Sequence, residues 1–125
     1  MEKARSWLPI AAYCGLIFFL SSLEKGPDYF TLPFPYADKI GHVVLYSGLG
    51  FLVARRLTHK GDLGRRHIYM ISFLFCLAYG ITDELHQRYV PGRMFEFADI
   101  LADTIGGLVG AAVHFLVARA PRRYV

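Results

Sequence analysis

The sequence predicts an all-α protein, a four-helix transmembrane bundle. The chain has 125 residues, of which 54% are hydrophobic, whereas soluble domains are usually a little under half apolar. The apolar residues gather in four blocks, at Trp7 to Leu23, Ile40 to Ala54, Ile68 to Thr82 and Phe97 to Ala118. The first and fourth blocks reach the roughly 17 to 25 helical residues that span a bilayer. The second reaches this range only with Asp38 and Lys39, and the third only with Asp83 to Leu85. We therefore expect one domain over residues 1–125, with helices at about 7–23, 38–54, 68–87 and 97–118.

Two other classes of protein fit less well. A soluble helical bundle needs polar outer faces at helical spacing, and the segments 16–20 and 71–78 have none. A secretory signal peptide would explain the basic start, Lys3 and Arg5, and the apolar stretch that follows. However, the sequence EKGP at 24–27 stands where a small-residue cleavage site would be needed. We expect the first helix to remain in the protein.

The basic residues indicate how the chain crosses the membrane. Ten Lys and Arg residues fall in the two tails and the second connection, against four in the other two connections. Basic segments stay on the cytoplasmic side, so we expect both termini in the cytoplasm and the protein in a bacterial cytoplasmic membrane. The same residues would contact anionic lipid. Membrane lipid is therefore the expected partner, and nucleic acid is not.

The second helix starts with ionisable residues on one face. Lys39, His42 and Tyr46 are three and four positions apart, so they lie on the same side of a helix. Asp38 suits a helix N-cap, Lys39 suits an interfacial anchor and Tyr46 suits a packed aromatic. His42 lies one turn inside the helix beside other ionisable groups, which favours a functional role at membrane depth.

The third helix ends in a second polar group. Asp83 and Gln87 share a face, whereas Glu84 fits a helix end that emerges into water. Pro91 and Gly92 predict a turn, which would place Arg93 in a short outer connection. Arginine binds phosphate or carboxylate through two parallel hydrogen bonds, but a lipid headgroup or an acidic partner would explain Arg93 as well.

The fourth helix carries two carboxylates on one stripe with small residues. Asp99 and Asp103 are one turn apart, and the stripe continues through Gly106 and Gly110. Small residues at this spacing mark close helix contacts in membranes. We therefore expect both carboxylates to face the interior of the bundle. An ion pair between helices, with Lys39 or Arg93, is the structural alternative.

Taken together, these motifs resemble the VanZ-like family of small membrane proteins. The resemblance covers about residues 8 to 118 and rests on four motifs in order: Asp38-Lys39-x-x-His42-x-x-x-Tyr46, Thr82-Asp83-Glu84-x-x-Gln87, Pro91-Gly92-Arg93 and Asp99-x-x-x-Asp103-Thr104-x-Gly106. The family's namesake is associated with teicoplanin resistance, a form of antibiotic resistance, in Gram-positive bacteria. The resemblance therefore implies a role at the cell envelope.

The first functional hypothesis is an outward-facing polar pocket that binds or processes the polar headgroup of an envelope lipid or lipid-linked precursor. The roles it assigns are catalytic for His42, Asp83 and Asp103, substrate-binding for Lys39, Tyr46, Gln87 and Arg93, and structural for Asp38, Glu84, Gly106 and Gly110. The carboxylates of Asp83, Asp99 and Asp103 would suit Mg²⁺ or Ca²⁺, which take oxygen ligands. The sequence has no nucleophile elbow or phosphate-binding loop, and Ser47 is the one hydroxyl inside the second helix near Tyr46.

Two alternatives stay open. A proton-coupled transporter would use buried Asp and His residues as a relay, but four helices are few, so it would need a homodimer. A structural or regulatory membrane subunit would use the polar groups only to hold the helices together. Under the first hypothesis the outer ends of the second, third and fourth helices form the pocket, and the first helix is a wall without site residues.

Overall fold

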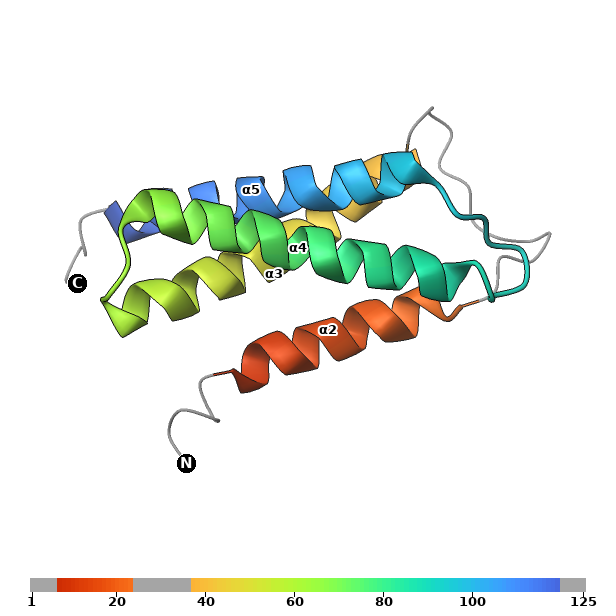
Figure 1. Cartoon of the computed structure of the whole chain (residues 1–125), viewed down its shortest axis with the longest axis horizontal. Helices are drawn as coiled ribbons and strands as arrows, with labels where there is room; N and C mark the ends of the chain where they lie inside the picture. Colours follow the sequence, from red (N-terminus) through yellow and green to blue (C-terminus); the bar gives the residue numbers. More distant parts are fainter. Residues whose placement is uncertain (1–6, 24–36, 120–125) are drawn as a thin grey trace, which may run out of the picture.

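The computed structural model describes residues 7–23 and 37–119. Within these residues the chain forms four α-helices and no β-strand: α2 (Leu8–Ser21), α3 (Ala37–Lys60), α4 (Arg65–Gln87) and α5 (Phe97–Arg119). Figure 1 shows them side by side, with α3, α4 and α5 grouped together and α2 along one edge. The predicted all-α four-helix bundle is confirmed.

The largest difference from the expected helix bounds is in α3. This helix continues to Lys60, six residues beyond the expected end at residue 54, and α4 already begins at Arg65. Leu57 explains the extension because it is buried and belongs to the apolar core. Gly61 then ends the helix in a left-handed conformation, with φ of 80°. The connection between these two helices, expected at 55–67, is therefore reduced to 61–64.

Two helices, α4 and α5, are long and apolar enough to cross a membrane. The apolar helix α2 is shorter, with 14 residues. The number of membrane crossings and the side on which each terminus lies stay predictions. Five of the basic residues on which the predicted orientation rests lie outside the described residues: Lys3, Arg5, Lys25, Arg122 and Arg123.

Glycines allow α3 and α5 to approach closely. This pair of helices shares the most extensive contact in the bundle. A Cβ atom at Gly106 would lie 2.6 Å from the carbonyl oxygen of Val43, and one at Gly110 would collide with the backbone of Ser47. Small residues at such contacts are typical of membrane helices. The contact fixes which turns of α5 face which turns of α3.

Helix α2 is attached to the other helices by tyrosine hydroxyls. Tyr13 on α2 donates a hydrogen bond of 2.6 Å to the carbonyl oxygen of Leu45, and Tyr79 on α4 donates one of 2.6 Å to that of Cys14. Ile10 and Ile17 add buried apolar surface from α2 to the core.

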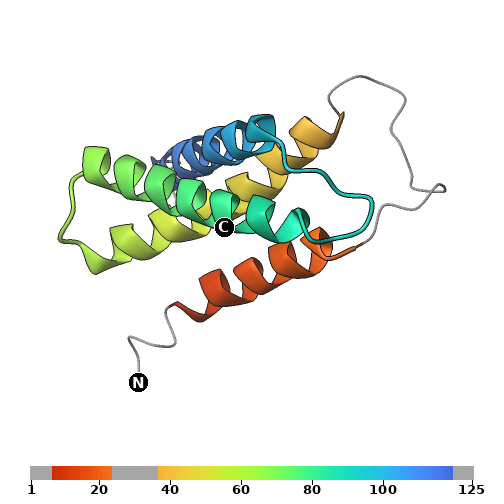
Figure 2. The ribbon, with the colours of Figure 1, turned by 45° about the vertical axis from the view of Figure 1, so that its right-hand side comes forward.

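The two ends of the bundle differ in the helix ends that meet there and in the polar or basic residues that these carry. At one end the N-termini of α3 and α5 meet the C-termini of α2 and α4, on the right of Figure 1 and towards the viewer in Figure 2. We call this the polar end. At the opposite end, the basic end, α3 is joined to α4 and α5 finishes at Arg119.

Candidate functional site

Most of the buried charged side chains lie at the polar end. Asp83 and Asp99 are 5% exposed, and Glu84 and Asp103 are fully buried. They come from α4 and α5, and α3 adds the partly buried side chains of Lys39 and His42. Burying a charge is costly unless other groups pair with it. The contacts of these side chains therefore decide what the site can do.

His42 connects α3 to α5. Its Nδ1 atom lies 2.8 Å from Oδ1 of Asp103, and its Nε2 atom lies 3.7 Å from Oδ2 of Asp99. Asp99 and Asp103 are one helical turn apart, so both face the same side of α5. The contact at Gly106 brings that side against α3. An imidazole positioned by carboxylates in this way is suited to act as a general acid or base.

Lys39 forms the centre of a second group of contacts. Its ammonium lies 2.7 Å from Asp38 and 2.6 Å from Asp99, and it also bonds the carboxylate of Glu96. The carboxylate of Asp99 therefore contacts both Lys39 and His42. Asp38, expected as an N-cap, lies inside the first turn of α3 and pairs with Lys39.

Asp83 faces a different set of partners. Ser21 donates a hydrogen bond to its Oδ1 atom. Its Oδ2 atom accepts hydrogen bonds from Tyr46, at 3.3 Å, and from Gln87, at 3.4 Å. The expectation that the first helix is a wall without site residues is wrong, because the buried Ser21 of α2 reaches the polar cluster.

Glu84 is not at a helix end that emerges into water, as its position had suggested. The side chain is fully buried, and its Oε2 atom accepts a hydrogen bond of 3.1 Å from the backbone N–H of Glu96. Among the described residues no hydrogen-bond donor reaches the Oε1 atom of Glu84 or the Oδ2 atom of Asp103. Buried polar atoms in proteins almost always have a partner, so these two oxygens need an explanation.

The predicted turn before α5 positions Arg93. The backbone N–H of Arg93 donates to the carbonyl oxygen of Val90, and Gly92 has φ of 78°, as this tight turn requires. The guanidinium then donates to the carbonyl oxygens of Leu20 and Leu23, each at 3.2 Å. These carbonyls end α2, where a cation is favourable. Arg93 thus links the α4–α5 connection to α2.

A hollow of about 120 Å³ opens at this end of the bundle. Its lining is mostly polar and consists of Asp38, His42, Gln87, Gly92, Arg93, Met94, Glu96 and Asp99.

Of the three residues expected to be catalytic, His42 lines the hollow, Asp103 lies behind it, and Asp83 belongs to the cluster around Ser21. Of those expected to bind substrate, Gln87 and Arg93 line the hollow, whereas Tyr46 is fully buried and Lys39 is held by three carboxylates.

The expected metal ligands are divided between two places. Asp99 and Asp103 both contact His42, but both oxygens of Asp83 already accept hydrogen bonds. Two other groups have ligand atoms within 4.8 Å of one another: His42, Glu84 and Asp103, and Asp38, Glu96 and Asp99. Asp83 is in neither group.

Three residues of the site were not singled out from the sequence. Glu96 precedes Asp99 by three positions, and this spacing could have indicated a shared face. Gly80 gives room to Asp103, because a Cβ atom there would lie 2.8 Å from the Oδ2 atom. Ser21 carried no signal beyond being a polar residue at the end of an apolar block.

Comparison with known proteins places the chain in a family. No curated protein and no solved structure matches it significantly. The sequence does match the VanZ/LLP1 family over residues 6–118, which includes every residue of the hollow and all four helices except the last residue of α5. Members of this family are associated with membranes, in agreement with the apolar α4 and α5. This match across nearly the whole chain shows that the protein belongs to the VanZ/LLP1 family.

Proposed function

We propose that this protein binds, in the hollow at the polar end, the polar headgroup of an envelope lipid or of a lipid-linked precursor. The observation that carries the proposal is the position of His42. Its ring lines the hollow, and a fully buried carboxylate, Asp103, holds it at 2.8 Å. A histidine that is oriented from behind and open in front is suited to bind a ligand and exchange a proton with it.

The size of the hollow fits a headgroup and not a whole lipid. Pockets for drug-sized ligands have volumes of about 300 to 1,000 Å³, whereas this one has about 120 Å³. It can hold a phosphate-sized group with a few water molecules. Met94, Phe97 and Leu101 are more than half exposed within two turns of the lining residues. They offer an apolar surface along which acyl chains would remain in the bilayer.

The proposal includes an orientation in the membrane. Arg55, Arg56, Lys60, Arg65, Arg66 and Arg119 belong to the basic end, against Lys39, Arg88 and Arg93 among the described residues of the polar end. By the positive-inside rule the basic end faces the cytoplasm and the hollow faces outwards. An alkaline phosphatase fused to the C-terminus should be inactive, and a green fluorescent protein there should fluoresce. An active phosphatase would place the hollow on the cytoplasmic side.

The binding proposal is tested with a short-chain phospholipid that is soluble in water, added to the purified protein in a non-ionic detergent. We expect saturable binding, and we expect His42→Gln to weaken it at least about tenfold, since a hydrogen bond to a charged group contributes about 1.5 to 3 kcal/mol. His59→Gln is the matched control because His59 is exposed near the end of α3. Equal binding by all three proteins would overturn the proposal.

One observation favours a second candidate, a structural or regulatory membrane subunit. The cations Lys39 and Arg93 both bond to groups of the same chain, Lys39 to carboxylates and Arg93 to the last carbonyls of α2. For such a subunit, His42→Gln would lower the melting temperature and the protein would show no saturable binding of the phospholipid. The same titration, run beside a melting curve, therefore separates the two candidates.

A further inference from the structure

Three helices each place one metal-binding side chain at a common point. His42 comes from α3, Glu84 from α4 and Asp103 from α5, and one ligand atom of each lies within 4.8 Å of the other two. Ligands of one metal ion are about 2.0 to 2.2 Å from it, so they are roughly 3 to 4 Å from one another. Small side-chain movements would bring this group to that geometry. We call it the His42 group.

The His42 group contains carboxylate oxygens that lack a partner. Glu84 and Asp103 are both fully buried, and among the described residues no donor reaches Oε1 of Glu84 or Oδ2 of Asp103. Burying a carboxylate oxygen without a donor costs several kcal/mol in an apolar setting. The two carboxylates face one imidazole, which can supply one positive charge at most. A divalent cation would satisfy both.

The neighbouring acidic group differs in this respect. Asp38, Glu96 and Asp99 are equally close to one another, but the ammonium of Lys39 lies among them, 2.7 Å from Asp38 and 2.6 Å from Asp99. That group carries its own cation within the chain. We call these three carboxylates with Lys39 the Lys39 group, and the comparison favours a metal ion in the His42 group over the Lys39 group.

We propose that His42, Glu84 and Asp103 bind one divalent transition-metal ion, with Zn²⁺ preferred over Mg²⁺ and Ca²⁺. The donor set decides the preference, because an imidazole nitrogen suits Zn²⁺, whereas Mg²⁺ and Ca²⁺ favour oxygen ligands alone. The ring nitrogen of His42 that binds the ion must carry no hydrogen, so a neutral imidazole would keep its one hydrogen on the other nitrogen and a protonated imidazole would release one proton to the solvent.

The metal ion would also complete the proposed function, on which this last step rests. Three protein ligands leave a fourth position open, as in catalytic zinc sites. Of the three ligands, His42 lines the hollow, whereas Glu84 and Asp103 are fully buried behind it, so a headgroup oxygen would reach the open position from the His42 side. The ion would supply the positive charge that Lys39 and Arg93, bonded within the chain, do not offer to an anionic headgroup.

The test is a metal titration of the full chain in detergent after removal of metals with a chelator. We expect one Zn²⁺ per chain, weaker binding of Mg²⁺ and Ca²⁺, and visible absorption bands of a low-symmetry site when Co²⁺ is used as a probe. Changes around a metal ligand typically cost about 10- to 100-fold in affinity. Loss of a ligand in Glu84→Gln or His42→Ala should therefore weaken Zn²⁺ binding at least about tenfold.

Glu96→Gln is the matched control, because it removes a carboxylate from the Lys39 group and leaves the His42 group intact. It should bind Zn²⁺ as the unaltered protein does, and each variant must elute as a single monodisperse species. The proposal is overturned if the folded, unaltered protein shows no saturable Zn²⁺ binding. It is also overturned if Glu96→Gln loses the ion and Glu84→Gln keeps it.

A second titration separates this proposal from the proposed function. The short-chain phospholipid is added to protein that is either metal-free or loaded with Zn²⁺. Tighter lipid binding by the loaded protein supports both proposals. Zn²⁺ binding without any lipid binding supports the metal site and overturns the headgroup function. Lipid binding by a protein that takes up no Zn²⁺ overturns the metal site alone.

Discussion

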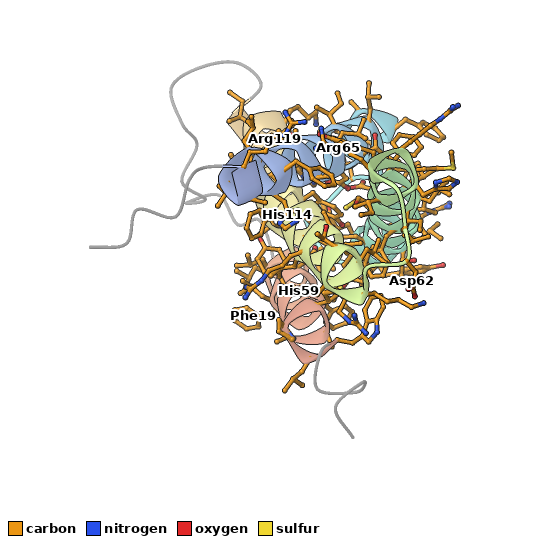
Figure 3. The ribbon with its side chains drawn as sticks, turned by 90° about the vertical axis from the view of Figure 1, so that its left-hand side faces the viewer. Phe19, His59, Asp62, Arg65, His114 and Arg119 are labelled. Carbon is orange, nitrogen blue, oxygen red and sulfur yellow. The ribbon has the colours of Figure 1, made fainter. Side chains whose placement is uncertain are left out.

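The polar end and the basic end of the bundle differ in how far their charged side chains are exposed. At the polar end the Lys39 side chain is 21% exposed and its partner Asp99 is 7% exposed, with 2.6 Å between their charged atoms. At the basic end the Lys60 and Asp62 side chains are 58% and 68% exposed, with 3.8 Å between theirs. Figure 3 shows the basic end facing the viewer, with His59, Asp62, Arg65 and Arg119 around the ends of the helices.

This difference shows that burial, more than the number of charges, separates a site from a solvated surface. Exposed charges are stabilised by water, and pairs between them contribute about 0 to 1 kcal/mol. Two arginines of the basic end also lie over aromatic rings, Arg56 over Trp7 and Arg65 over Phe115. Carboxylates buried between helices cost free energy, and ionisable residues inside membrane proteins often belong to functional sites.

We expect the largest effect from a substitution that breaks the close contact between α3 and α5. Gly110→Leu would place a side chain against the backbone of Ser47, which cannot move aside within a helix. We expect a loss of at least about 3 kcal/mol in the free energy of unfolding, or no folded protein. Thermal melting in detergent measures it. Gly41→Leu is the control, because a Cβ there meets no other atom within 4 Å; equal losses would contradict the close approach of α3 and α5.

The next effect compares one lysine from each end. Lys39→Met leaves three carboxylates without their ammonium, and removal of one partner from a buried pair typically costs about 3 to 5 kcal/mol. Because Lys39 is partly exposed, we expect about 2 kcal/mol. Lys60→Met should change stability by less than about 0.5 kcal/mol. Urea unfolding followed by circular dichroism measures both, and similar values would remove the distinction between the ends.

A smaller effect tests how α2 joins the polar end. Ser21→Ala removes the donor to Oδ1 of Asp83 and should cost about 1 to 3 kcal/mol, because it leaves a buried acceptor without its partner. The control is Thr82→Ala, since the exposed Thr82 bonds a carbonyl oxygen of its own helix. If the two variants melted at the same temperature, Ser21 would not anchor α2.

The smallest effect has the opposite sign. In metal-free protein, Glu84→Gln replaces a buried carboxylate, one oxygen of which has no donor, with a neutral amide of the same shape. We expect an increase of about 1 kcal/mol in the free energy of unfolding, since functional carboxylates are often kept at a cost in stability. Differential scanning calorimetry with a chelator present measures it. A marked loss of stability would mean that Glu84 is a structural residue.

The sequence predicted the fold well because it depends on local patterns. Apolar blocks indicate membrane helices, and residues four apart, such as Asp99 and Asp103, share a face whatever the neighbours are. The length of α3 was underestimated because its last turns are amphipathic, with Leu57 buried and Arg55 exposed. A hydropathy block does not capture a helix that continues beyond the apolar region.

The partners of the site residues could not be predicted in the same way. The rotation of α4 about its axis decides whether Glu84 faces water or the interior, and packing against α3 and α5 sets that rotation. The contact of Arg93 with the end of α2 depends on the path of the connection between α4 and α5. Such contacts join residues far apart in the chain, as do Ser21 and Asp83, and periodicity does not specify them.

The central claim is that the polar end, and not the basic end, binds a headgroup. Photolabelling tests it most directly, with a phospholipid whose headgroup carries a diazirine and with peptides identified by mass spectrometry. We predict labelling of residues 38–47 and 87–99 that an excess of the short-chain phospholipid prevents and that His42→Gln abolishes. Labelling concentrated on residues 55–66, or labelling that the competitor does not reduce, would contradict the claim.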